Sequence, residues 1–153
     1  MSVKVQFESF DLNYILFEMK KVNTAVGAAV SFVGFVRELS RINQSEQLTS
    51  LYLEYYPGMT EKSLLEIESK AREKWDLEDV FIVHRVGELK LHDQIVGVIV
   101  LSAHRKNAFE ACAFIMDYLK TEAPLWKKET TTKSSTWVEA KESDDHMRLH
   151  WNN

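Results

Sequence analysis

The chain has 153 residues, of which 45% are hydrophobic and 27% are charged, and its formal net charge is −4 at pH 7. A chain of this length and composition is expected to fold as one globular domain, which excludes collagen-like and disordered proteins. A net acidic protein is a poor general ligand for nucleic acid, because that affinity depends on a continuous basic surface. The longest apolar stretch, residues 95–101, is too short to span a bilayer.

The cysteine content and the N-terminal residues indicate a reducing compartment. A single cysteine cannot form an internal disulfide. The residues after Lys4 contain no apolar run of the kind that follows the basic residues of a secretory signal. We therefore predict a cytoplasmic protein.

The first half of the chain predicts three strands and one helix. Alternating polarity, or a cluster of β-branched and aromatic residues, marks the strands at residues 3–7, 27–37 and 48–56. Gly34 predicts a bulge or a close backbone approach inside the second strand. Asp11 is a suitable N-cap for a helix that ends near Lys21. The polar residues 38–47 lack a period and predict a loop.

The second half predicts two helices and three further strands. Thr60 follows the turn dipeptide Pro57-Gly58 and is predicted to cap a helix. The apolar face of this helix recurs at spacings of three and four: Leu64, Ile67, Ala71 and Trp75. A later helix ends before Pro124, because the residue before proline disfavours helical backbone. We place that helix at residues 107–120 and the strands at residues 80–86, 94–102 and 136–140.

This order of elements predicts an α+β fold, with helices packed on a mostly antiparallel sheet. Neither a repeat nor a linker divides the chain. We assign residues 1–143 to one domain and residues 144–153 to a polar tail that frays.

Basic residues gather in three local groups. They are Arg37 and Arg41; His104, Arg105 and Lys106; and Lys120, Lys127 and Lys128. We expect the fold to bring the groups together, which would form a cationic pocket on an acidic body. Such a pocket suits a small anionic ligand.

Residues 102–107 lead from a predicted strand into a predicted helix. The first turn of a helix offers unpaired N–H groups and a partial positive charge, so anions bind there. Arg105 can hold a phosphate through two hydrogen bonds, and His104 can donate to an oxyanion or transfer a proton. The alternative is a solvated corner with ordinary surface charges, which spacing alone favours.

Lys120 and Lys127 lie on either side of a short segment interrupted by Pro124. We expect Trp126 to supply an apolar wall beside Lys127, which would lower the pKa of the amine toward a range useful for catalysis. The alternative for Lys120 is a cation placed at a helix C-terminus, where the helix dipole favours it. Taken alone, that alternative is the better explanation.

Three other candidates are discounted. Cys112 lies at helical spacing between apolar residues and is predicted to be a core thiol. His146 and His150 have a spacing that suits a metal but lack a third ligand in the polar tail. His84 alternates with apolar residues and is predicted to be a hydrogen-bonded structural histidine. We therefore predict no metal site.

Several motifs in register closely resemble the large, catalytic subunit of the molybdopterin synthase family. The match runs in order from about residue 27 to residue 143 and includes residues 53–60, 84–89, 102–105, 114–120, 124–129 and 137–140. The resemblance implies a fold of the α/β-hammerhead type. It also implies a sulfurtransferase that forms the dithiolene of molybdopterin, in molybdenum cofactor biosynthesis, from cyclic pyranopterin monophosphate.

The resemblance further implies the partners of the chain. The sulfur arrives as a C-terminal thiocarboxylate on a small ubiquitin-like subunit, whose Gly-Gly tail enters a pocket of the large subunit. The family assembles as a heterotetramer around a large-subunit dimer. Because the partner supplies the sulfur and the pterin is the substrate, no bound cofactor is implied.

The match also assigns site residues. Lys120 and Lys127 correspond to two essential lysines and are the implied catalytic residues. The implied substrate-binding residues are Phe35, Val36, Arg37, His104, Arg105, Lys120, Lys127, Lys128, Glu129 and Lys141.

Two positions depart from the family pattern. Phe35 stands where the family commonly has a lysine, and Lys141 replaces an arginine that can grip a phosphate bidentately. We expect these departures to affect affinity more than reaction type. Two rival functions remain, an anion-binding module without chemistry and a scaffold that grips a ubiquitin-like tail.

Overall fold

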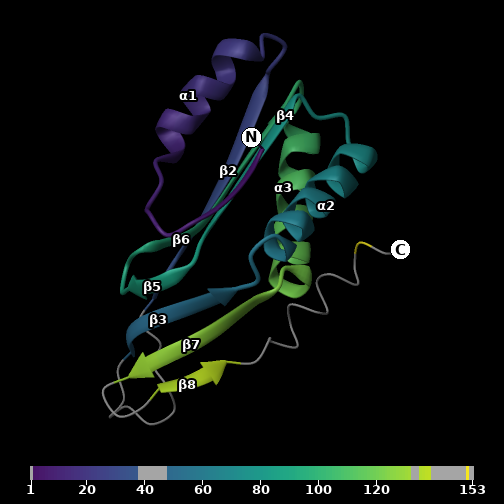
Figure 1. Ribbon diagram of the computed structural model, residues 1–153. Coiled ribbons are helices and arrows are strands. Elements are labelled where there is room, and N and C mark those ends of the chain that lie inside the picture. Colours follow the sequence, from purple (N-terminus) through teal and green to yellow (C-terminus); the bar gives the residue numbers. More distant parts are fainter. Residues whose placement is uncertain (1, 38–47, 132–134, 139–150, 152–153) are drawn as a thin grey trace.

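The computed structural model describes residues 2–37, 48–131, 135–138 and 151. Three helices and eight strands are described within these ranges (Figure 1). The helices are α1 (Leu12–Val22), α2 (Met59–Lys74) and α3 (Arg105–Glu122). The strands are β1 (Val3–Gln6), β2 (Ala28–Phe35), β3 (Leu48–Tyr55), β4 (Asp79–Arg85), β5 (Gly87–Lys90), β6 (Gln94–Ser102), β7 (Leu125–Thr131) and β8 (Ser135–Val138).

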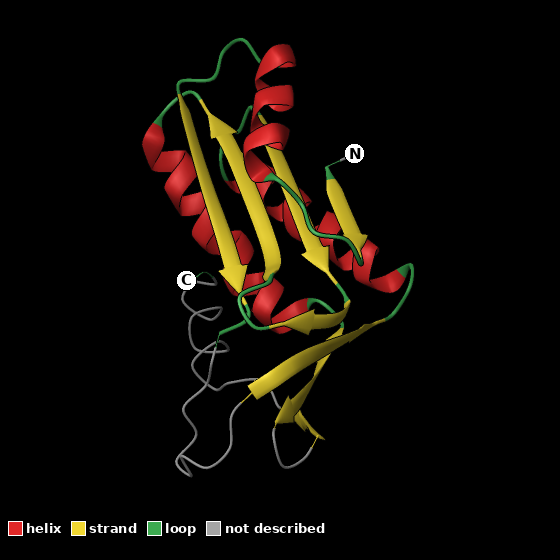
Figure 2. Ribbon diagram, turned by 90° about the vertical axis from the view of Figure 1, so that its left-hand side faces the viewer, coloured by secondary structure: helices red, strands yellow, loops and turns green. Residues whose placement is uncertain are grey.

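The strands form two four-stranded sheets. The first sheet has the order β1-β4-β6-β2, and the second has the order β5-β3-β7-β8. Every pair is antiparallel except β1 with β4. Figure 2 shows the first sheet between the helices, with the second sheet crossing beneath one end of it. This arrangement confirms the predicted α+β class and its mostly antiparallel pairing.

Apolar clusters cover both faces of the first sheet. On one face, the β4 residues Val80 and Ile82 belong to a core cluster shared with α2 and α3. On the other face, Phe81 and Val83 pack with half-buried residues of α1. Alternate residues of β4 therefore point to opposite helical layers, as the strand period requires. A smaller cluster on the second sheet comprises Val36, Leu51, Leu53 and Leu89.

Several predicted boundaries are confirmed. Asp11 caps α1, and its carboxylate accepts hydrogen bonds from the backbone N–H groups of Asn13 and Tyr14. The β2–β6 register shifts between Gly34 and Phe35, where a bulge was expected. A Cβ at Gly34 would lie 2.8 Å from a methyl group of Val96, so this glycine marks a close approach.

The start of α2 differs from the prediction. The helix is capped at Gly58, whose N–H donates to the Glu61 carboxylate, and Thr60 lies inside the helix instead of at its cap. The buried Thr60 hydroxyl accepts from the Tyr56 N–H and donates to the Pro124 carbonyl. Thr60 therefore ties the start of α2 to the segment that connects α3 to β7.

Two strands are absent from the sequence-based prediction. Residues 87–93 were expected to be a connection but contain β5, and the segment after Pro124 forms β7. Strand β7 lies between β3 and β8, so neighbouring strands on both sides satisfy its backbone despite its polar composition. The predicted loop at residues 38–47 lies outside the described residues.

The expected fraying of the C-terminal tail is wrong at Trp151. The Trp151 ring packs edge-to-face on Trp75 and Phe114, and its indole N–H donates to Asp117. The last described residue is therefore anchored on α2 and α3. Among the described residues, none of the helices is both long and apolar enough to cross a membrane.

Candidate functional site

The two lysines expected to be catalytic flank the connection between α3 and β7. Lys120 lies in the last turn of α3 and is exposed, and Lys127 is a half-buried residue of β7. The connection between the helix and the strand is short, and the Thr60 hydroxyl holds it at the Pro124 carbonyl. The fold thus presents both ammonium groups near the junction of the two sheets.

Alternation along β7 sorts the neighbouring residues onto two faces. Lys127 and Glu129 are register partners of Leu53 and Leu51, two buried residues of the small core cluster. They therefore share the inner face of the second sheet with that cluster. Trp126 lies on the opposite face and is 49% exposed, so the expectation that it walls Lys127 is wrong. The residue beside Lys127 on the inner face is Leu53.

The charges of both lysines act on a buried histidine, His84. His84 is 5% exposed, and its Nδ1 lies 2.8 Å from the Arg85 carbonyl oxygen, which confirms the predicted hydrogen-bonded histidine. Burial lowers the pKa of His84 from 6.5 to about 4. The hydrogen bond with Arg85 opposes this shift, whereas the positive charges of Lys120 and Lys127 add to it. The charges of both lysines therefore add to the cost of protonating this one buried imidazole.

The end of β2 reaches the same apolar cluster. Val36 is 2% exposed, and its backbone N–H donates to the Asp93 carbonyl while its own carbonyl accepts from the His92 N–H. The flanking residues Phe35 and Arg37 are exposed. This backbone anchor holds Val36, directly after β2, in the cluster on the inner face of the second sheet, with the predicted substrate-binding residues Phe35 and Arg37 on either side of it in the chain.

His104 and Arg105 lie at the other end of α3. His104 is the N-cap and Arg105 is the first helical residue, and both are exposed. The helix rises about 22 Å from Arg105 to Lys120, at 1.5 Å per residue. The expected convergence of all basic groups within one chain is therefore wrong. One helix separates the predicted phosphate-binding pair from the predicted sulfur-transfer pair.

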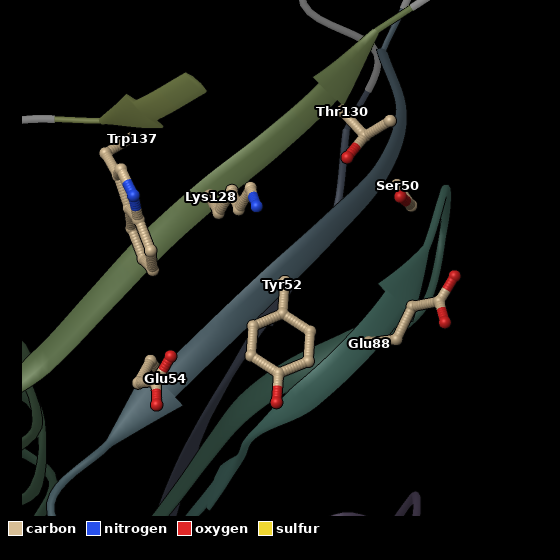
Figure 3. A pocket seen from close by; sticks show the side chains of 7 residues that line it. All are labelled: Ser50, Tyr52, Glu54, Glu88, Lys128, Thr130 and Trp137. Atoms are coloured by element: carbon tan, nitrogen blue, oxygen red, sulfur yellow. The ribbon is translucent and has the colours of Figure 1, made fainter. Parts of the chain in front are cut away.

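The outer face of the second sheet carries a different pocket, which we call the outer pocket (Figure 3). Its volume is about 400 Å³, and it is lined by Ser50, Tyr52, Glu54, Glu88, Lys128, Thr130 and Trp137. The Lys128 ammonium lies 5.9 Å from the centre of the Trp137 ring. Because its lining carries two carboxylates and one ammonium, the outer pocket does not suit a phosphate. Lys128 thus lies on the face opposite Lys127 and Glu129.

Of the other predicted residues, one lies in the core and four lie outside the described residues. Cys112 is buried, and burial raises the pKa of its thiol to about 11, as expected of a core thiol. Lys141, Arg41, His146 and His150 lie outside the described residues. The influence of the lysine charges on His84 was missed, because it depends on the packing of three elements that are distant in the sequence.

The chain matches a known protein family over most of its length. The family model described as "MoaE protein" matches residues 5–122. The chain belongs to the MoaE family. A molybdopterin synthase catalytic subunit from Vibrio cholerae is 49% identical over 149 residues, which cover 97% of each chain. The predicted family resemblance is thereby confirmed.

Two solved structures support the same assignment. The molybdopterin cofactor biosynthesis protein E from Burkholderia multivorans has a TM-score of 0.83 and 47% identity, covering 99% of this chain and 97% of that one. The molybdopterin synthase from Staphylococcus aureus has a TM-score of 0.83 and 32% identity, covering 91% of this chain and 98% of that one. The hammerhead-type fold implied by the resemblance is confirmed, whereas the roles of the individual residues stay predictions.

Proposed function

We propose that this MoaE-family chain is the catalytic subunit of a molybdopterin synthase. It transfers sulfur from the C-terminal thiocarboxylate of a small ubiquitin-like carrier to cyclic pyranopterin monophosphate, which produces the dithiolene of molybdopterin. Family membership supports the reaction, and the observation that carries the site is the placement of Lys120 and Lys127 on either side of the short connection between α3 and β7. We propose a cytoplasmic enzyme with no resident cofactor or metal.

The lysine pair fits the demands of each sulfur transfer. The thiocarboxylate sulfur forms a carbon–sulfur bond to the precursor, and an oxygen of the precursor leaves as water after protonation. Hydrolysis of the acyl–sulfur bond then returns the carrier as a carboxylate. One ammonium holds the anionic carrier terminus, and the other protonates the leaving oxygen. Glu129 lies on the same face of β7 as Lys127 and is suited to orient it.

The separation along α3 leads us to include a second copy of the chain in the site. Arg105 lies about 22 Å from Lys120 along the helix, and His104 lies one residue farther away, which is more than one pterin can bridge. In a symmetric dimer, the same surface of each copy meets its counterpart. We propose that His104 and Arg105 of one copy bind the phosphate of the substrate whose sulfur transfer is performed by the lysines of the other. The small carrier binds each end of this dimer, which gives a heterotetramer.

Mixed dimers test both the role of these residues and the proposal that two chains contribute to one site. Lys120→Ala and Arg105→Ala both change exposed residues, so both variants are expected to fold. Each variant alone should lower single-turnover formation of molybdopterin by about 100-fold or more, with purified thiocarboxylated carrier and precursor. Dimers that contain one copy of each variant, isolated through two different affinity tags, should recover about half of the wild-type activity, because one of two sites is intact.

A control variant and two alternative results distinguish a site shared between two chains from a site within one chain and from simple anion binding. Lys62→Ala, at an exposed position of α2, serves as the matched control and should retain full activity. Mixed dimers as inactive as their parents would show that the two pairs of residues do not act across the dimer. Tight binding of precursor by the wild-type protein, without product when the carrier is supplied, would instead support the anion-binding module.

A further inference from the structure

Strand β2 forms one edge of the first sheet, and its outer side has no partner strand among the described residues. All of its pairing is with β6, and Figure 2 shows it at the border of the sheet opposite β1. Soluble proteins protect such edges with charged side chains or prolines, or keep the edge strand short. The sequence of β2, Ala-Ala-Val-Ser-Phe-Val-Gly-Phe, contains neither a charge nor a proline. This edge is therefore suited to pair with another strand.

The side chains of β2 also lack cover within the described part of the chain. On the α1 side of the sheet, Ala29 and Ser31 are exposed, and the apolar cluster on that side includes no residue of β2. On the α3 side, Phe32 is 40% exposed, although its register partner Val98 is fully buried. The apolar core thus reaches the edge of the sheet and ends there with a partly uncovered ring.

A second copy of the chain is the occupant that best suits this edge. Two copies of one strand can pair antiparallel about a two-fold axis, so that the outward N–H groups of each copy meet carbonyl groups of the other. No charge along β2 opposes this approach. The proposed site also requires a second copy, because His104 and Arg105 lie too far from Lys120 within one chain.

The regular part of β2 defines how two copies pair. It covers residues 28–34, because the register with β6 shifts after Gly34. The midpoint of this part is Ser31. A two-fold axis through Ser31, perpendicular to the sheet, keeps every side chain on its own face and pairs Val30 with Phe32 of the other copy. The exposed Phe32 ring then packs beside a β-branched side chain, which is a favourable cross-strand pair.

We propose that two copies of the chain dimerise through β2, with the two strands antiparallel about a two-fold axis at Ser31. The two four-stranded sheets then join into one continuous sheet. The interface deepens the proposed function and rests on it, because it is the surface that brings His104 and Arg105 of one copy toward the lysines of the other.

Antiparallel pairing places the separated groups of two copies at the same level. Strand β2 begins beside Ser102, two residues before His104, and α3 runs in the same direction as β2 (Figure 1). Residues 28–34 span about 20 Å at 3.4 Å per residue, close to the rise of about 22 Å along α3 from Arg105 to Lys120. Reversing one copy against the other therefore sets the start of each α3 level with the end of its counterpart.

A cysteine at the axis tests both the surface and the register. In Ser31→Cys, the two thiols face each other between Cα atoms about 4.5–5.5 Å apart, which a disulfide can bridge. Ala29→Cys is the matched control, because it is exposed on the same face of the same strand but lies about 14 Å from its counterpart in the other copy. The native Cys112 is buried and should not react.

The expected cross-links follow from the pairing about Ser31. Under mild oxidation, Ser31→Cys should run mainly as a disulfide-linked dimer on a non-reducing gel, and Ala29→Cys should run as a monomer. Ala29→Cys mixed and equilibrated with Val33→Cys should cross-link, because these two positions are opposite each other across the axis. Failure of Ser31→Cys to cross-link, or equal cross-linking of Ser31→Cys and Ala29→Cys, would overturn the proposal.

A charge at the axis tests the dimer without cross-linking. In Ser31→Lys, two ammonium groups face each other, which should raise the dissociation constant of the dimer by about 10-fold or more in analytical ultracentrifugation. Ser31→Thr is the matched control and should retain the dimer, because threonine favours a strand and carries no charge. Single-turnover formation of molybdopterin should fall with the dimer in Ser31→Lys only. A dimer of Ser31→Lys as tight as the wild type would overturn the proposal.

The results also distinguish this interface from the proposed function. A dimer that cross-links through Ser31→Cys, but forms no molybdopterin with carrier and precursor, would confirm the interface and refute the proposed function. In the opposite case, the wild-type chain is a monomer, and the thiol of Ser31→Cys is protected from alkylation only when the carrier is added. That result would assign the edge of β2 to the carrier and overturn the interface.

Discussion

At the scale of single residues, the neutral state of His84 links protein stability to pH. Folding lowers the pKa of His84 from 6.5 to about 4, so the unfolded chain binds more protons than the folded chain between these values. The free energy of unfolding should therefore fall as the pH drops through this window and level off, for this group, below about 4. The full contribution is roughly 3 kcal/mol.

Urea denaturation of the wild type and His84→Asn at several pH values measures this effect. His84→Asn cannot titrate and should lose less stability than the wild type between pH 6.5 and pH 5, although carboxylates affect both proteins equally. The control is the same comparison above pH 7, where the two curves should run parallel. Curves that stay parallel over the whole range would show that His84 does not lose its proton on folding.

The residues most accessible to sequence reasoning were those that carry motifs. The match to the family singled out Lys120 and Lys127, whose catalytic role stays a prediction, and helical spacing identified Cys112 as a core thiol. The role of Trp126 was wrong because the face of a side chain depends on whether its segment is a strand, and β7 was not predicted. The influence of the lysine charges on His84 depends on strand register and helix packing, which no local pattern contains.

At the scale of elements, β5 and β7 were not predicted, because their structure depends on pairing with neighbouring strands. The sequence of β7, Leu-Trp-Lys-Lys-Glu-Thr-Thr, has little of the apolar alternation that marks a strand. Its backbone groups are satisfied by β3 on one side and β8 on the other. Strand propensity depends on such neighbours, so tertiary pairing outweighed composition. The helices were easier to predict than these strands, because an apolar face such as that of α2 is a local property of the sequence.

The packing of α1 on β6 gives a prediction at this scale. Gly97 leaves room for the residues that lead into α1, since a Cβ there would lie 2.7 Å from a ring carbon of Phe10 and 3.0 Å from a methyl group of Leu12. Gly97→Ala should therefore lower the free energy of unfolding by about 1–3 kcal/mol. Urea denaturation measures the loss.

The smaller side chain in Phe10→Leu should relieve part of this clash. In the double variant the cost should therefore be less than the sum of the two single costs, which a double-mutant cycle detects. Gly97→Ala with wild-type stability, or strictly additive costs, would show that Phe10 does not limit the space above Gly97.

At the scale of the whole molecule, the long helix α3 determines how the chemistry is distributed. It separates His104 and Arg105 from the lysine pair, so the cationic pocket expected from charge grouping does not form within one chain. The fold class followed from the order of elements, but the division into two sheets did not. Local sequence patterns predict the length of a helix, but they do not predict which residues lie near each of its ends. This is why the second copy enters the proposed site.

The anchoring of the chain end gives the last prediction. Trp151 lies 5.8 Å from Trp75 and 5.7 Å from Phe114, measured between ring centroids, and its carbonyl accepts from the Lys74 ammonium. Its indole N–H donates to Asp117. The side chain and carbonyl of Trp151 thus contact residues of both α2 and α3 and the residue that ends α2.

Trp151→Ala should lower the free energy of unfolding by about 1–3 kcal/mol, because it removes aromatic contacts together with a buried apolar surface. Trp151→Phe is the matched control, since it keeps a ring against Trp75 and Phe114 and loses the N–H bond to Asp117. We expect its loss, measured by urea denaturation, to be less than half that of Trp151→Ala. Equal losses would assign the anchor to the hydrogen bond instead of the ring contacts, and no loss in either variant would show that the chain end does not stabilise the fold.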